Sequence, residues 1–405
     1  MRQDFLWGAA TAAHQIEGNN LNSDWWARER AGLTDERSGD ACDSYHRYPE
    51  DMELLRRAGL DAYRFSLEWA RIEPDEGHFS RAELDHYRRM IRTAHDLELE
   101  PVVTLQHFTL PTWFADKGGF WGDVGVDAFA RYVERCCDLL GDVRWVVTIN
   151  EPNILNAMHM LSSGAEADPF VLGPDEELGH RLAEVHRRAV GIVRERTDAN
   201  VGWSVAQQAL EPTPGHEEVF DRINHRWEDL YLVASRGDDF IGVQSYTSQR
   251  VGPEGVLPHP PGDTNTLTGW AYRPDALEIC LRRAWQVGEH TPLMVTENGI
   301  ATADDRVCIE YTATALAGLE AAVADGIDVR GYLHWSALDN FEWGSWAPTF
   351  GLIAVDRQTF ARTPKPSLAW LGEVASAHRL RPGARPDARQ PRRSDEEGAS
   401  PHRPA

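Results

Sequence analysis

Eight short apolar runs, spread over most of the chain, constrain its fold more than any other feature. They occupy residues 5–10, 61–66, 101–105, 144–149, 201–206, 240–245, 292–296 and 329–335. Longer stretches with helical spacing of apolar residues lie between them, at residues 49–58, 81–97, 127–140, 179–196, 273–287 and 310–325. Short apolar runs that alternate with helices are typical of a parallel sheet whose strands are buried on both faces. Eight strand–helix units favour a closed barrel, although a doubly wound open sheet has a similar local pattern.

Polar and aromatic residues, rather than simple turn residues, stand at the ends of these expected strands. In a barrel the carboxyl ends of all strands meet at one face, and barrel enzymes keep their active sites there. The pattern therefore predicts an α/β protein with a single (β/α)₈ TIM barrel and one pocket. The residues that we expect at this pocket are Gln15, Arg64, His107, Asn150, Glu151, Tyr246, Glu297 and Trp335.

One large domain accounts for most of the chain. The protein has 405 residues, and single barrel domains reach that length. With 42% hydrophobic and 26% charged residues, it has enough apolar side chains for a large core. Neither a linker nor a repeat divides residues 1–378, which we expect to form the barrel domain. Residues 379–405 are rich in Arg, Pro, Ser and Asp and have few large apolar side chains, which predicts a disordered C-terminal tail.

Charge, cysteine content and the N-terminus restrict the partners of the protein. The net charge is −23, which repels phosphate backbones, so we expect no nucleic-acid partner and a neutral small-molecule substrate. The five cysteines lack the spacing of a metal site, and we expect free structural thiols and no metal or cofactor. The N-terminus has no long apolar segment, and no run of about 18 apolar residues occurs, which predicts a cytoplasmic protein without a membrane partner. None of these features sets the oligomeric state.

Two glutamates at strand ends are candidates for paired carboxyl chemistry. Glu151 ends the run WVVTINE before Pro152, and Glu297 lies in LMVTENG, where Gly299 permits a tight turn. Cleavage of a glycosidic bond needs two carboxyl groups that flank the bond. A lone glutamate at a strand end is more often a solvated rim residue, but strands four and seven lie across the barrel mouth from each other. A gap of about 5–5.5 Å between the carboxyls would mean retention of configuration, and a wider gap would mean inversion.

Five motifs in order give the chain a family resemblance. They are FLWGAATAAHQIEG at residues 5–18, YRFS at 63–66, NEP at 150–152, TENG at 296–299 and DNFEW at 339–343. From about residue 5 to residue 370, the chain resembles glycoside hydrolase family 1, the β-glucosidase and β-galactosidase family. The resemblance implies a retaining β-glycosidase, foremost a β-glucosidase, that hydrolyses terminal β-D-glycosyl residues of small glycosides. β-Galactosidase and β-fucosidase activities stay open.

The resemblance also assigns roles to individual residues. Glu151 would be the general acid/base and Glu297 the nucleophile, with Arg64 and Tyr246 bonded to Glu297. Since a guanidinium lowers the pKa of a nearby carboxyl, we expect Arg64 to keep Glu297 ionised. Glu151 has to hold a proton, which burial and a neighbouring negative charge can arrange. The residues that would contact the sugar or its leaving group are Gln15, His107, Asn150, Tyr246, Trp270, Trp335, Glu342 and Trp343.

Within this set the resemblance separates the sugar side from the leaving-group side. Gln15 and Glu342 would bond sugar hydroxyls, and Trp335 would form the platform beneath the ring. Asn150 would contact the 2-hydroxyl, whose hydrogen bond strengthens in the transition state. Trp270 would lie on the leaving-group side.

The sequence departs from the family pattern at three places. Phe108 and Thr109 follow His107 where the family usually has Trp and Asp, and Gln244 with Ser245 precede Tyr246 where Asn and Tyr are usual. The loop at 344–350 lacks the usual acidic residue. The departure at Phe108 and Thr109 predicts altered sugar affinity or choice, and the loop at 344–350 predicts a differently shaped outer part of the site. The chain is also shorter than typical family members, and shortened loops after strands four to six predict a more open leaving-group side.

Two alternatives stay open. A 6-phospho-β-glycosidase would have serine in place of Glu342 and a nearby lysine, whereas Glu342 is present and its loop has no lysine. A catalytically weak sugar-binding homologue would normally have lost one of the two glutamates, and both are present. A nucleotide-binding oxidoreductase is disfavoured because no GxGxxG sequence follows an expected strand.

Overall fold

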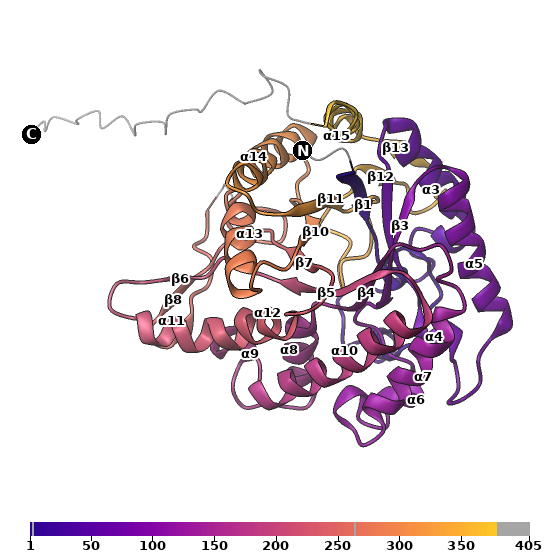
Figure 1. The fold of residues 1–405 in the computed structure, drawn as a ribbon, viewed down its shortest axis with the longest axis horizontal. Coiled ribbons are helices and arrows are strands. Elements are labelled where there is room, and N and C mark those ends of the chain that lie inside the picture. The colour runs from indigo at the N-terminus through magenta and orange to yellow at the C-terminus, as the bar shows by residue number, and fades with distance from the viewer. Residues whose placement is uncertain (2–3, 263–264, 379–405) are drawn as a thin grey trace, which may run out of the picture.

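A closed barrel of eight parallel strands forms the centre of the molecule (Figure 1). The computed structural model describes residues 1, 4–262 and 265–378, so the tail predicted at 379–405 lies outside the described residues. The barrel strands are β1 (Leu6–Ala10), β2 (Ala62–Ser66), β3 (Glu100–Gln106), β4 (Trp145–Asn150), β5 (Asn200–Ala206), β7 (Ile241–Gln244), β10 (Leu293–Asn298) and β11 (Val329–Trp335). They are hydrogen-bonded in chain order, and β11 pairs with β1 to close the ring. The predicted single barrel is confirmed, and each expected strand corresponds to one of its eight strands.

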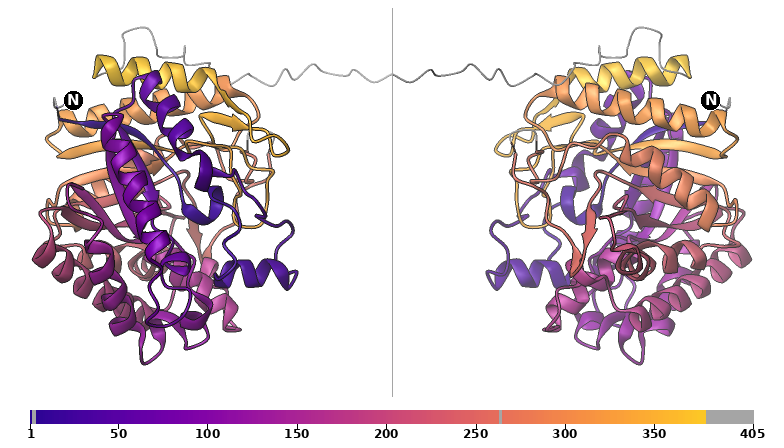
Figure 2. Two further views of the ribbon diagram at one scale, coloured as in Figure 1. Left: turned by 90° about the vertical axis from the view of Figure 1, so that its right-hand side faces the viewer. Right: turned by 90° about the vertical axis from the view of Figure 1, so that its left-hand side faces the viewer.

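Helices surround the barrel on its outer side (Figure 2). The long ones are α3 (Ser44–Ala58), α5 (Arg81–Asp96), α7 (Gly125–Cys137), α10 (Glu176–Arg196), α13 (Ala276–Val287), α14 (Asp305–Ala324) and α15 (Pro366–Ala377). The six predicted helices are confirmed, with ends that differ by a few residues. α5 shows why they form: Ser80 caps its N-terminus by accepting from the backbone of Glu83, and its buried face repeats with helical spacing at Leu84, Tyr87 and Ile91.

Smaller elements lie mostly in the connections that leave the carboxyl ends of the barrel strands. The short helices are α1 (Ala13–Ile16), α2 (Asp24–Arg30), α4 (Trp69–Ile72), α6 (Thr112–Ala115), η1 (Gly119–Trp121), α8 (Pro152–Ser162), α9 (Pro169–Leu172), α11 (Glu217–Asn224), the π-helix η2 (His225–Asp229) and α12 (Leu230–Ala234). The extra strands are β6 (Glu211–Pro212), β8 (Arg250–Gly252), β9 (Gly255–Val256), β12 (Ile353–Val355) and β13 (Arg362–Pro364). The sequence predicted none of these elements.

Apolar side chains fill both the inside of the barrel and the layer between strands and helices. Val102, Val147, Phe240, Met294 and Leu333 belong to one fully buried cluster contributed by the barrel strands and their starts. This packing makes the barrel interior a solid core. The polar strand ends beyond this core are therefore the part of the barrel where a site can form.

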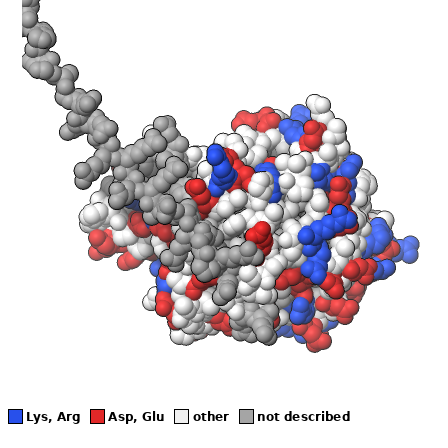
Figure 3. All heavy atoms as spheres, turned by 90° about the horizontal axis from the view of Figure 1, so that it is seen from above, with Lys and Arg blue, Asp and Glu red and all other residues white. Residues whose placement is uncertain are grey.

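The structure bears on the expectations about cysteines, membrane spans and charge. All five cysteines are free and buried, as predicted. Helix α14 is long and apolar enough to cross a membrane by length and composition, but it packs between α13 and α15 of the barrel. On the face shown in Figure 3, basic side chains lie among acidic ones.

Candidate active site

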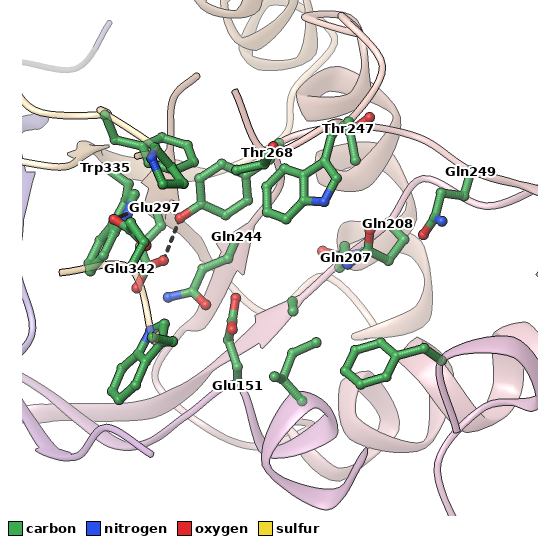
Figure 4. Close-up of a pocket in the computed structure, with 18 of the residues that line it drawn as sticks. Glu151, Gln207, Gln208, Gln244, Thr247, Gln249, Thr268, Glu297, Trp335 and Glu342 are labelled. Carbon is green, nitrogen blue, oxygen red and sulfur yellow. Dashed lines mark hydrogen bonds between the residues drawn. The ribbon is translucent and has the colours of Figure 1, made fainter. Parts of the chain in front are cut away.

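A cavity of about 450 Å³ opens at the carboxyl ends of the barrel strands (Figure 4). The structure places most of the predicted site residues in its wall: His107, Glu151, Tyr246, Trp270, Glu297, Trp335, Glu342 and Trp343. Gln15, Arg64 and Asn150 are fully buried and lie behind this wall, hydrogen-bonded to residues that line it. The predicted residues thus come together in one site with two layers.

Glu297 is held by hydrogen-bond donors. It lies in β10, and its carboxylate accepts from Arg64 Nη1 at 2.5 Å and from the Tyr246 hydroxyl at 2.5 Å. Arg64 is itself fixed, because its Nε donates to Thr104 Oγ1 at 3.0 Å. Arg64 and Tyr246 therefore occupy the positions predicted for partners of Glu297.

Burial and these donors act on Glu297 in opposite directions. Burial raises the pKa of Glu297, while the charge of Arg64 and hydrogen bonds from Tyr246, Arg64 and Gln244 oppose that rise. Arg64 acts in the expected direction, although burial has the larger effect on this pKa. Burial also raises the pKa of Tyr246 well above its ordinary value, so Tyr246 is the neutral donor of this pair.

Glu151 has different surroundings. It directly follows β4, with φ of 46°, and occupies the N-cap position of helix α8 without a cap hydrogen bond from its side chain. Burial raises the pKa of Glu151 well above its ordinary value, and the negative charge of Glu297 adds to the rise. No described residue donates a hydrogen bond to the Glu151 carboxyl, whereas Glu297 has several donors. A single proton shared by the two carboxyls is therefore more stable on Glu151.

The two carboxyls come from strands that are three steps apart in the ring of eight, namely β4 and β10. They are not diametrically opposed, as strands four and eight would be. The site they share nevertheless lies at one mouth of the barrel, where Figure 4 shows both side chains facing the same cavity.

Glu342 and Gln15 form a hydrogen-bonded unit. Trp335 Nε1 donates to Glu342 Oε1 at 3.2 Å, and Gln15 Nε2 donates to Glu342 Oε2 at 3.3 Å. Burial raises the pKa of Glu342 to about 8, with the charge of Glu297 adding to the rise. Gln15 Nε2 also donates to Asn340 Oδ1 at 2.8 Å, which leaves Gln15 Oε1 buried without a partner in the described part of the chain. This unit offers acceptors, and a proton on Glu342, to hydroxyl groups.

Asn150 links His107 to the residues around Glu297. Its Oδ1 accepts from Arg64 Nη2 at 2.5 Å and from Gln244 Nε2 at 2.9 Å, and its Nδ2 donates to His107 Nε2 at 3.2 Å. Burial and the charge of Arg64 hold the pKa of His107 well below its ordinary value. The neutral ring accepts at Nε2, so Nδ1 carries the proton.

The sequence matches one enzyme family over most of its length. The model of glycosyl hydrolase family 1 matches residues 1–232 and 228–380. The chain belongs to glycosyl hydrolase family 1. It is 32% identical to the thermostable beta-glucosidase B of Thermobispora bispora over 444 aligned residues, which cover 94% of this chain and 91% of that protein. The protein is therefore a glycoside hydrolase of the β-glycosidase type.

Solved structures agree with this assignment. The crystal structure of beta-glycosidase BGL167 is 42% identical, with a TM-score of 0.86, and the match covers 95% of this chain and 99% of that one. The beta-glucosidase from Thermotoga maritima in complex with deoxynojirimycin is 28% identical, with a TM-score of 0.86 and coverage of 94% and 99%. The predicted family resemblance is confirmed.

Aromatic rings of this family 1 enzyme pack around Trp343 in the cavity wall. The Trp343 ring stacks with His14, at 5.7 Å between ring centroids, and with His107, at 6.0 Å. Phe108 meets Trp343 edge-on at 4.9 Å, and Trp335 stacks on His107 at 6.0 Å. Trp343 is therefore fixed by packing before any sugar binds.

The departures from the family pattern at residues 108 and 109 have different locations. Phe108 lines the cavity with φ of 64°, whereas the Thr109 hydroxyl points away from it and donates to the buried Glu68 at 2.8 Å. Of these two residues, only Phe108 lines the cavity and could contact a sugar directly.

Gly299 has a role that differs from the predicted tight turn. Its φ is not in the left-handed region, but a Cβ atom there would lie 2.0 Å from the Trp335 carbonyl oxygen. Glycine is needed at this position because the ends of β10 and β11 approach closely.

Sequence reasoning missed one side of the cavity. The residues on it come from α8, α9, η2 and the segment after β5: Ile154, Met158, Phe170, Gln207, Gln208 and Trp227. Gln207 directly follows β5, so the strand-end rule that selected the other site residues could have found it. The helical residues had no comparable signal.

Proposed function

We propose that the protein is a retaining β-glucosidase that releases terminal β-D-glucosyl residues from small glycosides by double displacement. The observation that carries this proposal is the contrast between two carboxyls in one cavity. Glu297 accepts hydrogen bonds from Arg64 and Tyr246, which favour its ionised form. Glu151 is buried, accepts no hydrogen bond from the described residues and lies in the field of Glu297, and these conditions favour its protonated form.

In the first step, an oxygen of Glu297 bonds to the anomeric carbon while the bond from that carbon to the leaving oxygen breaks. Glu151 gives its proton to the leaving oxygen, so the leaving group departs as a neutral alcohol. The products of this step are a glycosyl ester of Glu297 and an ionised Glu151.

In the second step, water attacks the anomeric carbon and gives a proton to Glu151 as Glu297 leaves. Esterification removes the charge of Glu297, which had raised the pKa of Glu151, so Glu151 can now exist as a base. Arg64 and Tyr246 stabilise the carboxylate that forms again on Glu297. Two displacements at one carbon retain the β configuration.

The sugar side supports a neutral glycone. Glu342, Gln15 and His107 supply hydrogen-bonding groups there, and none of the described cavity-lining residues is Lys or Arg. Without Lys or Arg in this described lining, the charge of a sugar phosphate would have no counter-charge, and Glu342 stands where a 6-phospho-β-glycosidase would have serine, so that alternative is disfavoured. The choice of glucose follows the names of relatives such as the beta-glucosidase of Thermobispora bispora.

A panel of nitrophenyl β-glycosides, read together with proton NMR of the first sugar anomer released, tests this function. We expect the highest kcat/KM with the β-glucoside and initial release of β-glucose. Initial release of α-glucose would refute retention, and a preference for another glycone would refute the choice of glucose.

A further inference from the structure

Gln207 lies on the leaving-group side of the cavity, and the mechanism above does not use it. Its side chain is 2% exposed and lines the cavity wall directly after β5. Its Nε2 donates to Glu228 Oε2 at 3.2 Å and lies 3.5 Å from the carbonyl oxygen of Cys280. Both neighbours only accept, so the amide cannot be reversed without facing oxygen with oxygen. Gln207 Oε1 is therefore fixed as an acceptor, and it has no partner among the described residues.

Glu228 is the group that fixes this orientation. It is fully buried in the π-helix η2, and its Oε1 accepts from the backbone nitrogen of Gln208 at 2.9 Å. The two carboxylate oxygens thus hold two consecutive residues of the cavity wall. π-Helical turns are often found at functional sites. Here the turn brings Glu228 beneath the wall and places its neighbour Trp227 in the wall.

Asn153 makes this corner of the cavity rigid. Its Nδ2 donates to the carbonyl oxygens of Ala206 and Trp227, both at 2.7 Å. Helix α8, the end of β5 and η2 are therefore tied together at one side chain. A ligand would meet Gln207 in a preformed position, without the ordering cost of a mobile loop.

Apolar side chains form a large part of this side of the cavity, beside Gln207, Gln208 and Gln249. Ile154 and Met158 come from α8, and the Phe170 and Trp227 rings lie 5.6 Å apart. Phe170 is 40% exposed, so part of its ring is available at the surface. Figure 4 shows Gln207, Gln208 and Gln249 on the side of the cavity away from Glu342. A leaving group here would meet flat apolar surfaces and a fixed acceptor.

We propose that Gln207, positioned by Glu228, is a specificity-determining acceptor that selects leaving groups with a flat apolar ring and a hydroxyl donor. This inference rests on the proposed β-glucosidase function. A hydroxyl that reaches Gln207 Oε1 satisfies a buried acceptor, whereas a leaving group without one leaves it unpaired. A hydroxylated aromatic ring fits this chemistry best, because the ring suits the apolar wall and the hydroxyl group supplies the donor.

The test compares phenyl β-glucoside with its 2-, 3- and 4-hydroxyphenyl analogues, in the wild type and in Gln207→Met. The hydroxyl group changes leaving ability little relative to phenol, so the phenyl compound is a matched reference. We expect at least one isomer to have a kcat/KM roughly 3- to 10-fold above that of phenyl β-glucoside, and this advantage to fall toward one in Gln207→Met. Glucose disaccharides form a second arm, and a loss confined to them would identify a sugar ring rather than an aromatic ring as the source of the hydroxyl donor.

Glu228→Gln tests the positioning role separately. The new amide can donate to Gln207 Oε1, so it lets the Gln207 side chain reverse and present a donor instead. We expect the hydroxyl advantage to fall in this variant too, and it carries the test if Gln207→Met does not fold. Gln249→Met, at another glutamine of the cavity wall, is the matched control and should keep the advantage.

Three results would overturn the inference. A loss in Gln207→Met that is confined to the glucose disaccharides would refute the choice of a flat aromatic leaving group. A wild-type enzyme that hydrolyses phenyl β-glucoside but gains nothing from any hydroxyl-bearing leaving group would refute it while leaving the proposed function intact. Retention of the full advantage in both Gln207→Met and Glu228→Gln would do the same. Absence of hydrolysis of every β-glycoside tested would refute the proposed function, and the inference with it.

Discussion

Replacing Tyr246 with phenylalanine removes one donor from the nucleophile and leaves the aromatic ring in place. The Tyr246 hydroxyl donates to Glu297 Oε2 at 2.5 Å. In the proposed second step, negative charge returns to Glu297 as the ester bond breaks, so this hydrogen bond strengthens on the way to the transition state. Hydrogen bonds to charged groups contribute about 1.5–3 kcal/mol. Loss of that amount from the transition state slows hydrolysis of the glycosyl-enzyme by roughly 10- to 150-fold.

Stopped-flow release of nitrophenol from nitrophenyl β-glucoside measures this effect. We expect kcat of Tyr246→Phe to fall by the stated factor and a burst of nitrophenol to appear, because the glycosyl-enzyme accumulates. The pH profile gives a second readout. Burial raises the pKa of Glu297 and the Tyr246 hydrogen bond opposes that rise, so its removal raises the pKa further. Activity on the acid side of the profile should therefore disappear at a higher pH than in the wild type.

Tyr311→Phe is the matched control. The Tyr311 hydroxyl donates to the carbonyl oxygen of Tyr246 at 2.7 Å, so this variant removes a hydrogen bond from the same residue without touching Glu297. We expect a loss of about 1 kcal/mol in the free energy of unfolding, without a burst and without a moved acid limb. A Tyr246→Phe enzyme with unchanged kcat, no burst and the wild-type acid limb would refute the reasoning.

Three further predictions concern the carboxyls and a buried ion pair. Glu297→Gly should abolish hydrolysis of aryl β-glucosides, and added azide should restore turnover with an α-glucosyl azide product; undiminished activity contradicts the nucleophile assignment. Glu151→Ala should keep fast glycosylation only with good leaving groups and should slow deglycosylation, which a leaving-group series in rapid-quench experiments measures; an equal loss for all leaving groups contradicts the acid/base role. In the wild type, Arg362 Nε donates to Asp51 Oδ1 at 2.7 Å, and both side chains are fully buried. Arg362→Leu leaves the Asp51 carboxylate without its cation, so urea unfolding should show a free energy of unfolding that is lower by about 3–5 kcal/mol.

Each barrel strand carries its own signal in the sequence, and the polar and aromatic residues at the strand ends favoured a closed barrel over an open sheet. A run such as residues 145–149 is mostly apolar on both faces, which is typical of a buried parallel strand. Strand ends then meet at one face by the geometry of the barrel, so Glu151 and Glu297 could be placed together without any contact information. Element ends were less predictable: α3 begins at Ser44 and runs through Pro49, where the sequence suggested a start.

The leaving-group side was less predictable because its residues depend on packing between connections. Trp227 reaches the cavity from a π-helical turn, and Phe170 from a single-turn helix. Neither position repeats with a regular period that a sequence reveals. The net pKa of Glu297 was also beyond sequence reasoning, since it depends on how much burial outweighs Arg64.

Gln244 shows a residue that the sequence marks but only the structure explains. It pairs with Glu297 in the register of β7 and β10, and its Nε2 donates to Asn150 Oδ1 at 2.9 Å. A hydrogen bond from Gln244 also opposes the burial-driven rise in the pKa of Glu297. Glutamine is one methylene longer than the asparagine usual in the family, and here it reaches across to Asn150 on β4 from the strand beside the nucleophile. Gln244 therefore connects Asn150, the proposed partner of the sugar 2-hydroxyl, to the proposed nucleophile Glu297. A substitution of Gln244 would alter sugar recognition and the ionisation of Glu297 together.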